Sequence, residues 1–334
     1  MHILFVTEKY DNPRILKLAN SYNTLIGTFN DVFVNNPDYS FEHLTISENN
    51  SSDGDIHDAE QLNNILLNKK FDIAVVSAHR DVIVEMSTAQ KLGKKLFLIY
   101  WDTHLSAISS SLVVNFRMFA KTLHNAHVKN KYTLMQYSEY CNCIVTDYGY
   151  GKEFPNIYGV TTPQIDSIMK PLDVEKIYDV SFIGSPYTHE RQIFFRHLEN
   201  SGIKVHLFGG RGDNDNYLSV SDYATKINQT KINLNLNHSD IQPHRKGRAY
   251  EIAACGGFML ATHPEVYRSK NGIQFRDEED FISVTLDNVV QKIHHYLNNE
   301  NERQSISSNL REKYLSKFTA KHWWENIFDM VNDK

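Results

Sequence analysis

The chain has 334 residues, of which 41% are hydrophobic and 12% are aromatic, and its formal net charge at pH 7 is -5. This composition excludes a disordered protein, and a negative charge without any long run of Lys or Arg excludes the usual nucleic-acid-binding classes. The length is too great for one small core and suits two domains of roughly 150 residues each.

The cysteines and the hydropathy pattern predict a cytoplasmic protein. Cys141, Cys143 and Cys255 are too few for a disulfide framework, and their odd number suits a reducing compartment. Residues 1–10 lack the cationic start and apolar core of a signal peptide, and no apolar run approaches the roughly 18 residues of a membrane span. The interleaved basic and apolar residues of 115–137 leave peripheral association with the inner face of a membrane open, although a solvated helix face is the commoner explanation.

The first half of the chain alternates apolar runs with amphipathic stretches, which is typical of parallel α/β sheets. The apolar runs predict strands over 3–7, 41–46, 71–77, 95–100 and 140–147, the last of them closing the first domain. Helical spacing predicts helices over 13–22, 61–67 and 82–92. The segment 155–171 loses periodicity and contains three prolines, so we expect the interdomain linker there.

The second half restarts the strand pattern after this linker. Strands are predicted over 178–184, 203–208, 231–237 and 258–261, and helices over 189–201, 217–230, 287–297, 301–318 and 322–330. We expect 264–275 to be a loop and the acidic stretch 277–280 to mark the start of the helices that follow. The whole pattern predicts two doubly wound α/β domains.

Two ionisable side chains follow successive predicted strands. In doubly wound sheets, ligands gather at the carboxyl ends of the strands. His79 follows the run 71–77, and Asp102 follows the run 95–100. A histidine or a carboxylate in such a place can accept the proton of a hydroxyl nucleophile. The alternative is structural, with His79 capping a strand and Asp102 serving as the N-cap of the next helix.

The segment 244–263, HRKGRAYEIAACGGFMLATH, combines cations, a carboxylate and glycines. Lys246 and Arg248 precede Glu251, which shares a helical face with Arg248 because three positions separate them. Cations at the start of a short helix suit an anionic ligand, and a carboxylate one turn further on can accept two hydroxyl hydrogen bonds, as from a ribose. A surface helix that ends at a glycine C-cap is the alternative.

This segment resembles the C-terminal nucleotide-sugar motif of GT-B glycosyltransferases, and in particular that of the CgeB-like group. The group's pattern R-x-x-E-x-x-A-C-G-G-F-x-L is matched here by Arg248, Glu251, Ala254, Cys255, Gly256, Gly257, Phe258 and Leu260. The stretch DVSFIGS at 179–185 is similar to the start of the C-terminal domain in the same group. The resemblance implies the GT-B architecture, in which two Rossmann-like domains face each other across a cleft. It implies an acceptor domain over 1–160, a nucleotide-sugar domain over 161–318, and a C-terminal helix over 319–334 that packs back on the N-terminal domain.

The resemblance also implies a donor site in the second domain. Its residues would be Gly184, Ser185, Gly210, Asn237, Lys246, Arg248, Glu251 and Gly256. Backbone amides of the Gly184–Ser185 turn would approach the diphosphate, the cations would bind it, and Glu251 would hold the ribose. The stretch FDIAVVSAHRD is similar to a D-V-V-H-x-H stretch of many GT-B enzymes, which makes His79 the first candidate for the catalytic base and Asp102 the second.

The implied function is glycosyl transfer of the hexosyltransferase type, from a nucleotide-diphosphate sugar to a glycan, lipid-linked glycan or protein acceptor, as in cell-surface glycan biosynthesis. We expect no cofactor and no metal, because no D-x-D motif stands at the end of a predicted strand. Two alternatives stay open: a sugar-nucleotide epimerase on the same fold, and a non-catalytic binding or scaffold protein. Pro243 stands where many retaining enzymes have the first glutamate of an E-x7-E pair, so retaining and inverting chemistry both stay open.

Overall fold

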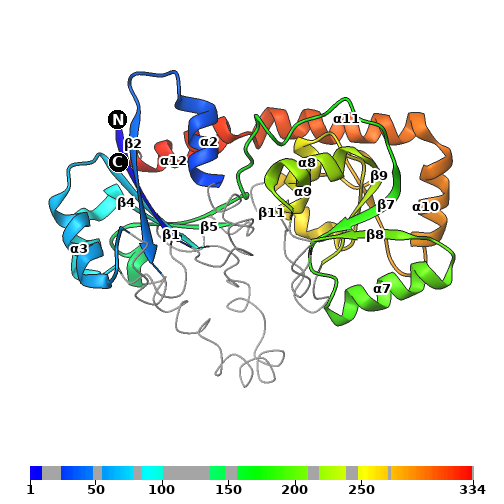
Figure 1. The fold of residues 1–334 in the computed structure, drawn as a ribbon, viewed down its shortest axis with the longest axis horizontal. Helices are drawn as coiled ribbons and strands as arrows, with labels where there is room; N and C mark the ends of the chain where they lie inside the picture. The colour runs from blue at the N-terminus through cyan, green and yellow to red at the C-terminus, as the bar shows by residue number, and fades with distance from the viewer. Residues whose placement is uncertain are drawn as a thin grey trace. The chain divides into compact units, whose positions relative to one another are not determined.

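The computed structural model describes residues 1–9, 24–47, 55–77, 84–100, 136–146, 156–209, 218–237, 247–269 and 272–332 (Figure 1). These residues form two compact units. The first unit holds the described residues of Met1–Asn12, Phe33–Val160 and Asn326–Lys334, and the second holds those of Pro13–Val32 and Thr161–Glu325. Each unit is built around one parallel β-sheet, which confirms the predicted α/β class.

The sheet of the first unit has six strands in the order β2-β1-β3-β4-β5-β6. The strands are β1 (His2–Lys9), β2 (Ser40–Ser47), β3 (Ile73–Ser77), β4 (Leu96–Tyr100), β5 (Asn142–Thr146) and β6 (Ile157–Val160). Every residue of β3 is buried, which explains why this strand is a continuous apolar run rather than an alternating one. The connecting helices include α3 (Ala59–Asn68) and α4 (Met86–Leu92), and α4 leads into the 3-10 turn η2 (Gly93–Lys95).

The sheet of the second unit has five strands in the order β13-β10-β9-β7-β8. The strands are β7 (Tyr178–Ile183), β8 (Val205–Phe208), β9 (Thr230–Asn235), β10 (Met259–Ala261) and β13 (Ile282–Ser283). The chain first builds outward from β7 to β8 and then builds in the opposite direction from β9 onward. The strand order therefore reverses between β7 and β9, and ligands of open α/β sheets bind at the carboxyl ends of strands at such a reversal.

Helices cover both faces of this second sheet (Figure 1). They are α7 (His189–Asn200), α8 (Val220–Asn228), α9 (Arg248–Ala254), α10 (Val289–Asn298) and α11 (Glu300–Lys317). Side chains of α8, α9 and the second half of α11 share one apolar cluster with Ile183 of β7. Side chains of α7 and α10 share another cluster with Val180 and Phe182 of the same strand. Alternate residues of β7 thus face opposite layers, as strand geometry requires.

Two further helices, α2 (Thr24–Phe33) and α12 (Ala320–Asn332), contact each other through aromatic side chains. In the second unit, Trp324 lies 5.3 Å from Phe29 between ring centroids, and its indole N–H donates to the Thr28 hydroxyl at 3.2 Å. In the first unit, Phe328 stacks on Tyr39 at 5.7 Å. None of the described helices is long and apolar enough to span a bilayer.

Several elements differ from the sequence prediction. The predicted linker contains β6, so the strand at 140–147 is not the last of its sheet. The predicted loop 264–275 holds the turn η4 (Pro264–Tyr267) and a small hairpin of β11 (Arg268–Ser269) and β12 (Gly272–Ile273). The acidic stretch 277–280 precedes β13 and not a helix, because Asp277 accepts hydrogen bonds from the amide and hydroxyl of Ser283. Elements of two to four residues are too short to show a period, which explains these errors.

At the helices, the structure also differs from the prediction. Helix α4 begins at Met86 rather than near residue 82, since Val84 and Glu85 are not helical. Helix α2 has no counterpart among the predicted helices. The predicted helix over 13–22 lies outside the described residues.

Candidate functional site

A tight turn follows β7 at the reversal point of the second sheet. Gly184 has φ +139°, and its amide donates to the carbonyl of Phe208 at 2.8 Å. A Cβ built at this glycine would overlap with Nη2 of Arg248. Both the backbone conformation and the approach of the guanidinium therefore require glycine here.

Arg248 begins helix α9 and brings a guanidinium to this turn. Its Cζ lies 4.3 Å from the ring centroid of Phe182, and its Nη1 donates to Oδ1 of Asn235 at 3.3 Å. Its Nε is buried and has no hydrogen-bond partner among the described residues. Helix α9 has only seven residues, so the guanidinium rather than the helix dipole provides the attraction for an anion. The site thus offers a fixed cation with spare hydrogen-bonding capacity.

Glu251 lies one turn further along α9 and forms a small network with Tyr223 of α8. The Tyr223 hydroxyl hydrogen-bonds with both Glu251 and Arg248. Burial raises the pKa of the Glu251 carboxyl above its ordinary value, although the Tyr223 hydrogen bond and the charge of Arg248 act in the opposite direction. Burial and the neighbouring Glu251 raise the pKa of Tyr223 well above its ordinary value. The carboxylate is therefore held close to the cation in a buried polar cluster.

Arg191, in the first turn of α7, is a site residue that the sequence analysis missed. Its guanidinium donates to the carbonyls of Ser185 at 2.7 Å, Leu236 at 2.8 Å and Asn237 at 3.2 Å. Burial and the nearby charge of Arg248 lower the pKa of Arg191 to about 9. The spacing of α7 could have revealed this residue. Arg191, Phe194 and Leu198 lie on the buried face of the helix, and an arginine is rarely buried unless its guanidinium has hydrogen-bond partners.

The other described residues predicted for the donor site separate into two places. Asn237 follows β9, where its amide donates to the Thr262 hydroxyl at 3.0 Å and its carbonyl accepts from Arg191. Arg191 therefore joins Ser185 and Asn237, two of the predicted residues, across the reversal point. Gly256 lies at the far end of α9 with φ +66°, and its conformation is that of a helix stop.

Four predicted residues, His79, Asp102, Gly210 and Lys246, lie outside the described part of the chain. Their roles stay predictions. Within the described ranges, no group of three or more His, Cys, Asp and Glu side chains is arranged to hold a metal ion.

A cavity of about 750 Å³ opens beside the reversal point. Its walls come from the first two turns of α7 and from the residues that follow β9, β10 and β13. Arg191 and Asn237 both line it, so the cavity is continuous with the residues that join the two strand ends. Its volume lies within the range of small-molecule sites, and its position at the carboxyl edge of the sheet is the one expected for a ligand.

Comparisons with known proteins give one family match and several similar folds. Residues 190–329 match the family model described as glycosyl transferase-like. A sequence search of curated proteins finds no match. HepE of Anabaena, solved in complex with UDP, has a TM-score of 0.58 and 11% sequence identity, with 100% of both chains covered.

Two further solved structures have similar scores. TarM of S. aureus, a G117R mutant in complex with Fondaparinux, alpha-GlcNAc-glycerol and UDP, has a TM-score of 0.53 and 11% identity over 82% of this chain and 58% of TarM, so the chain spans little more than half of that protein. An alpha1,3-fucosyltransferase has a TM-score of 0.50 and 10% identity over 100% of this chain and 91% of its own. Likeness at such identities shows the fold: the chain has the GT-B fold of these glycosyltransferases, and residues 190–329 match the glycosyl transferase-like family.

Proposed function

We propose that the protein is a glycosyltransferase that moves a sugar from a nucleotide-diphosphate sugar to an acceptor hydroxyl. The observation that carries the proposal is the guanidinium of Arg248, held against the Gly184 turn at the sheet reversal with Glu251 one helical turn away. A ligand with an anionic group beside a polyhydroxyl group would bind Arg248 through the first and Glu251 through the second. The structures of HepE with UDP and with UDP-glucose support this choice of ligand class by analogy of fold.

In the proposed reaction, the acceptor oxygen attacks the anomeric carbon of the donor while the bond from that carbon to the diphosphate oxygen breaks. The acceptor proton passes to a base, for which His79 and Asp102 are our candidates. The leaving diphosphate gains negative charge, which Arg248 and Lys246 stabilise without a metal ion. The Gly184–Ser185 turn contributes backbone amides, Glu251 accepts hydrogen bonds from the ribose hydroxyls, and Gly210 allows close approach of the nucleoside.

The energetic cost of the site favours a ligand-binding role over a scaffold without one. A carboxyl whose pKa is raised by burial and a guanidinium with a buried, unpaired Nε both lower the stability of the ligand-free protein. A scaffold would gain stability by replacing them. We extend the proposal to membership of the CgeB-like group, to an acceptor domain over 1–160 and a donor domain over 161–318, and to a glycan, lipid-linked or protein acceptor.

The experiment is a thermal-shift screen with UDP, GDP, ADP, CDP and TDP and with their common sugar conjugates. A ligand that binds only the native state raises Tm by mass action. At a ligand concentration of a hundred times Kd, the free energy of unfolding rises by about 2.7 kcal/mol. We expect one nucleotide to raise the Tm of the native protein and to leave the Tm of Glu251→Ala unchanged. Glu199→Ala, which removes an exposed carboxylate from α7, should retain the shift. If no nucleotide or conjugate shifts Tm in the native protein, the proposal is wrong.

A further inference from the structure

Arg191 reaches across the point at which the strand order of the second sheet reverses. Its side chain is 5% exposed, and three of its nitrogens donate to main-chain carbonyls. One of these carbonyls, at Ser185, belongs to the turn after β7, and the others, at Leu236 and Asn237, follow β9. A planar guanidinium has a fixed fork of donors, so these bonds set the spacing between the two strand ends.

The charges that act on Arg191 are those of Arg248 and Glu190. Its hydrogen bonds go to neutral main-chain carbonyls rather than to a carboxylate. Its Cζ lies 5.0 Å from the Phe182 ring, on which Arg248 also rests at 4.3 Å. Two guanidiniums thus share one aromatic ring. Glu251 acts on Arg248, and Glu190 acts on Arg191.

We propose that Arg191 is a positioning residue that makes the crevice between the Gly184–Ser185 turn and the end of β9 selective for a diphosphate over a monophosphate or an uncharged nucleoside. The inference rests on the proposed function. Arg191 holds the Gly184–Ser185 turn at a fixed distance from the end of β9, so that the turn amides and Arg248 meet both phosphates at once. Each of its three nitrogens donates to a main-chain carbonyl, so it acts through the turn and through its charge.

The electrostatics of the ligand-free protein agree with this role. Burial and the charge of Arg248 lower the pKa of Arg191, while the charge of Glu190 acts in the opposite direction. An anion bound between the turn and Arg248 would offset that repulsion.

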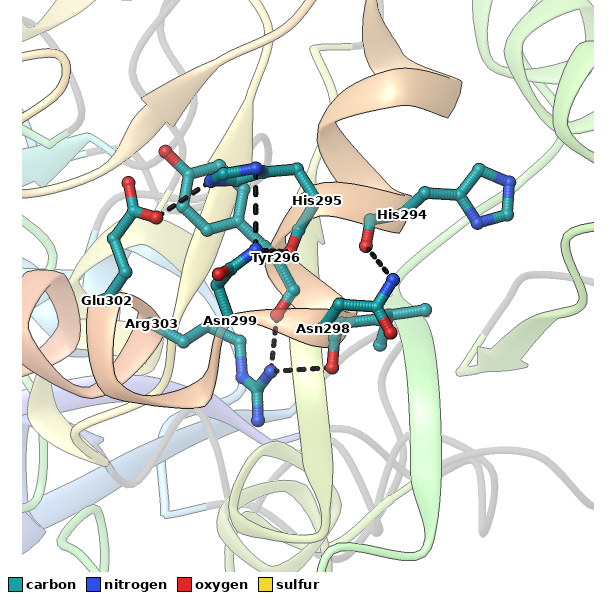
Figure 2. Close-up of polar contacts among 8 residues, drawn as sticks. His294, His295, Tyr296, Asn298, Asn299, Glu302 and Arg303 are labelled. Carbon is teal, nitrogen blue, oxygen red and sulfur yellow. Dashed lines mark hydrogen bonds and ion pairs between the residues drawn. The ribbon is translucent and has the colours of Figure 1, made fainter.

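The test compares Arg191→Lys with a matched control, Arg303→Lys. Arg303 is a second buried guanidinium, 8% exposed, and it also donates to main-chain carbonyls, those of Tyr296 and Leu297 at the junction of α10 and α11 (Figure 2). Both substitutions keep the positive charge but replace the planar, forked donors of a guanidinium with a single ammonium group. Calorimetric titration would measure Kd for the best-bound nucleoside diphosphate of the panel, for the monophosphate of the same nucleoside, and for the nucleoside itself.

We expect Arg191→Lys to weaken diphosphate binding by about tenfold, to weaken monophosphate binding less, and to leave nucleoside binding unchanged. The ratio of the monophosphate Kd to the diphosphate Kd therefore falls. Arg303→Lys should lower Tm and leave this ratio at its native value. A purely structural Arg191 would behave like Arg303, with all three Kd values changed alike or not at all, and that result would overturn the inference.

A second measurement covers the case in which Arg191→Lys does not fold. Hydrogen exchange of the native protein, read on the peptide that spans 182–191, should show protection before any nucleotide is added, because the turn is already held. Protection that begins only with nucleotide would refute the positioning role. Failure of the proposed function looks different, since the native protein would then bind no member of the panel.

Discussion

The two ends of helix α9 carry the two halves of one sequence motif, and they differ in how well their polar groups are paired. At the start, Arg248 Nε is buried without a partner among the described residues. At the end, the amides of Gly256 and Gly257 donate to the carbonyls of Ala253 at 3.1 Å and Ile252 at 2.9 Å. Native proteins leave few buried polar groups unpaired, and the start of α9, which has one, is the end at which we propose that a ligand binds.

This difference divides the motif R-x-x-E-x-x-A-C-G-G into parts with separate physical causes. Its first half places a cation and a carboxylate beside the turn after β7. Its second half packs small side chains into the core and ends the helix, and Cys255 is a buried thiol whose pKa burial raises to about 12. A thiol held in its neutral form in the core is inert, so the motif owes its cysteine to packing.

The largest effect should come from Gly184→Ala, which tests the start of α9. The new Cβ would displace the Arg248 guanidinium, and φ +139° is unfavourable for alanine. We expect nucleotide Kd to rise by about 10- to 100-fold and Tm to fall. Gly202→Ala is the matched control, because Gly202 also has a positive φ, +76°, and a Cβ there would meet nothing within 4 Å. Gly202→Ala should lower Tm and leave the nucleotide Kd unchanged. Equal losses of affinity in both variants would contradict a specific role for the Gly184 turn.

Gly256→Ala tests the other end of the helix. Alanine in the left-handed region costs about 1–2 kcal/mol, so unfolding in denaturant should occur at a lower concentration. The nearest atom to the new Cβ would be Cγ of Pro171 at 3.4 Å, an ordinary contact. Nucleotide Kd should stay within about twofold of the native value. A larger change in Kd would show that the predicted donor role of Gly256 is real and that the two ends act together.

The same comparison shows which parts of the molecule sequence reasoning can reach. Long apolar runs predicted β3 and β7, because burial requires apolar side chains along such strands, and sustained helical spacing predicted α7 and α11, because burial of one helix face imposes a period. Strand β13 has two residues and no period to detect. The pairing of Arg248 with Glu251 could be predicted because the two residues lie three positions apart on one helix.

The roles of Tyr223 and Arg191 could not be predicted from the sequence. Tyr223 reaches Glu251 from α8, and Arg191 reaches three carbonyls from α7, so both roles depend on how helices pack against the sheet. Spacing along the chain shows only what one element places on one face. Partners that different elements bring together become visible once the strand order is known, and that order also identifies the crevice between β7 and β9.

The smallest effect, and the sharpest test of how the start of α9 is built, is the dependence of stability on pH. Burial raises the pKa of Glu251 above its ordinary value of 4.5, so the folded protein holds this proton more tightly than the unfolded chain. The stability that the group contributes is complete below the unfolded pKa and is lost as pH rises through the folded pKa. Glu251→Gln cannot ionise, so it should gain stability relative to the native protein as pH rises from 4 toward 7, by roughly 1–3 °C in Tm.

The same variant should bind nucleotide about tenfold more weakly, because a carboxamide accepts fewer hydroxyl hydrogen bonds than a carboxylate. Asp166→Asn is the control. Burial also raises the pKa of Asp166, whose carboxylate accepts from the Tyr314 hydroxyl at 2.6 Å and the Ala320 amide at 2.7 Å, away from the crevice. It should show the same sign of pH dependence with Kd unchanged. If Glu251→Gln instead lost stability as pH rose, Glu251 would be an ion pair partner that the fold needs, and the start of α9 would be as structural as its end.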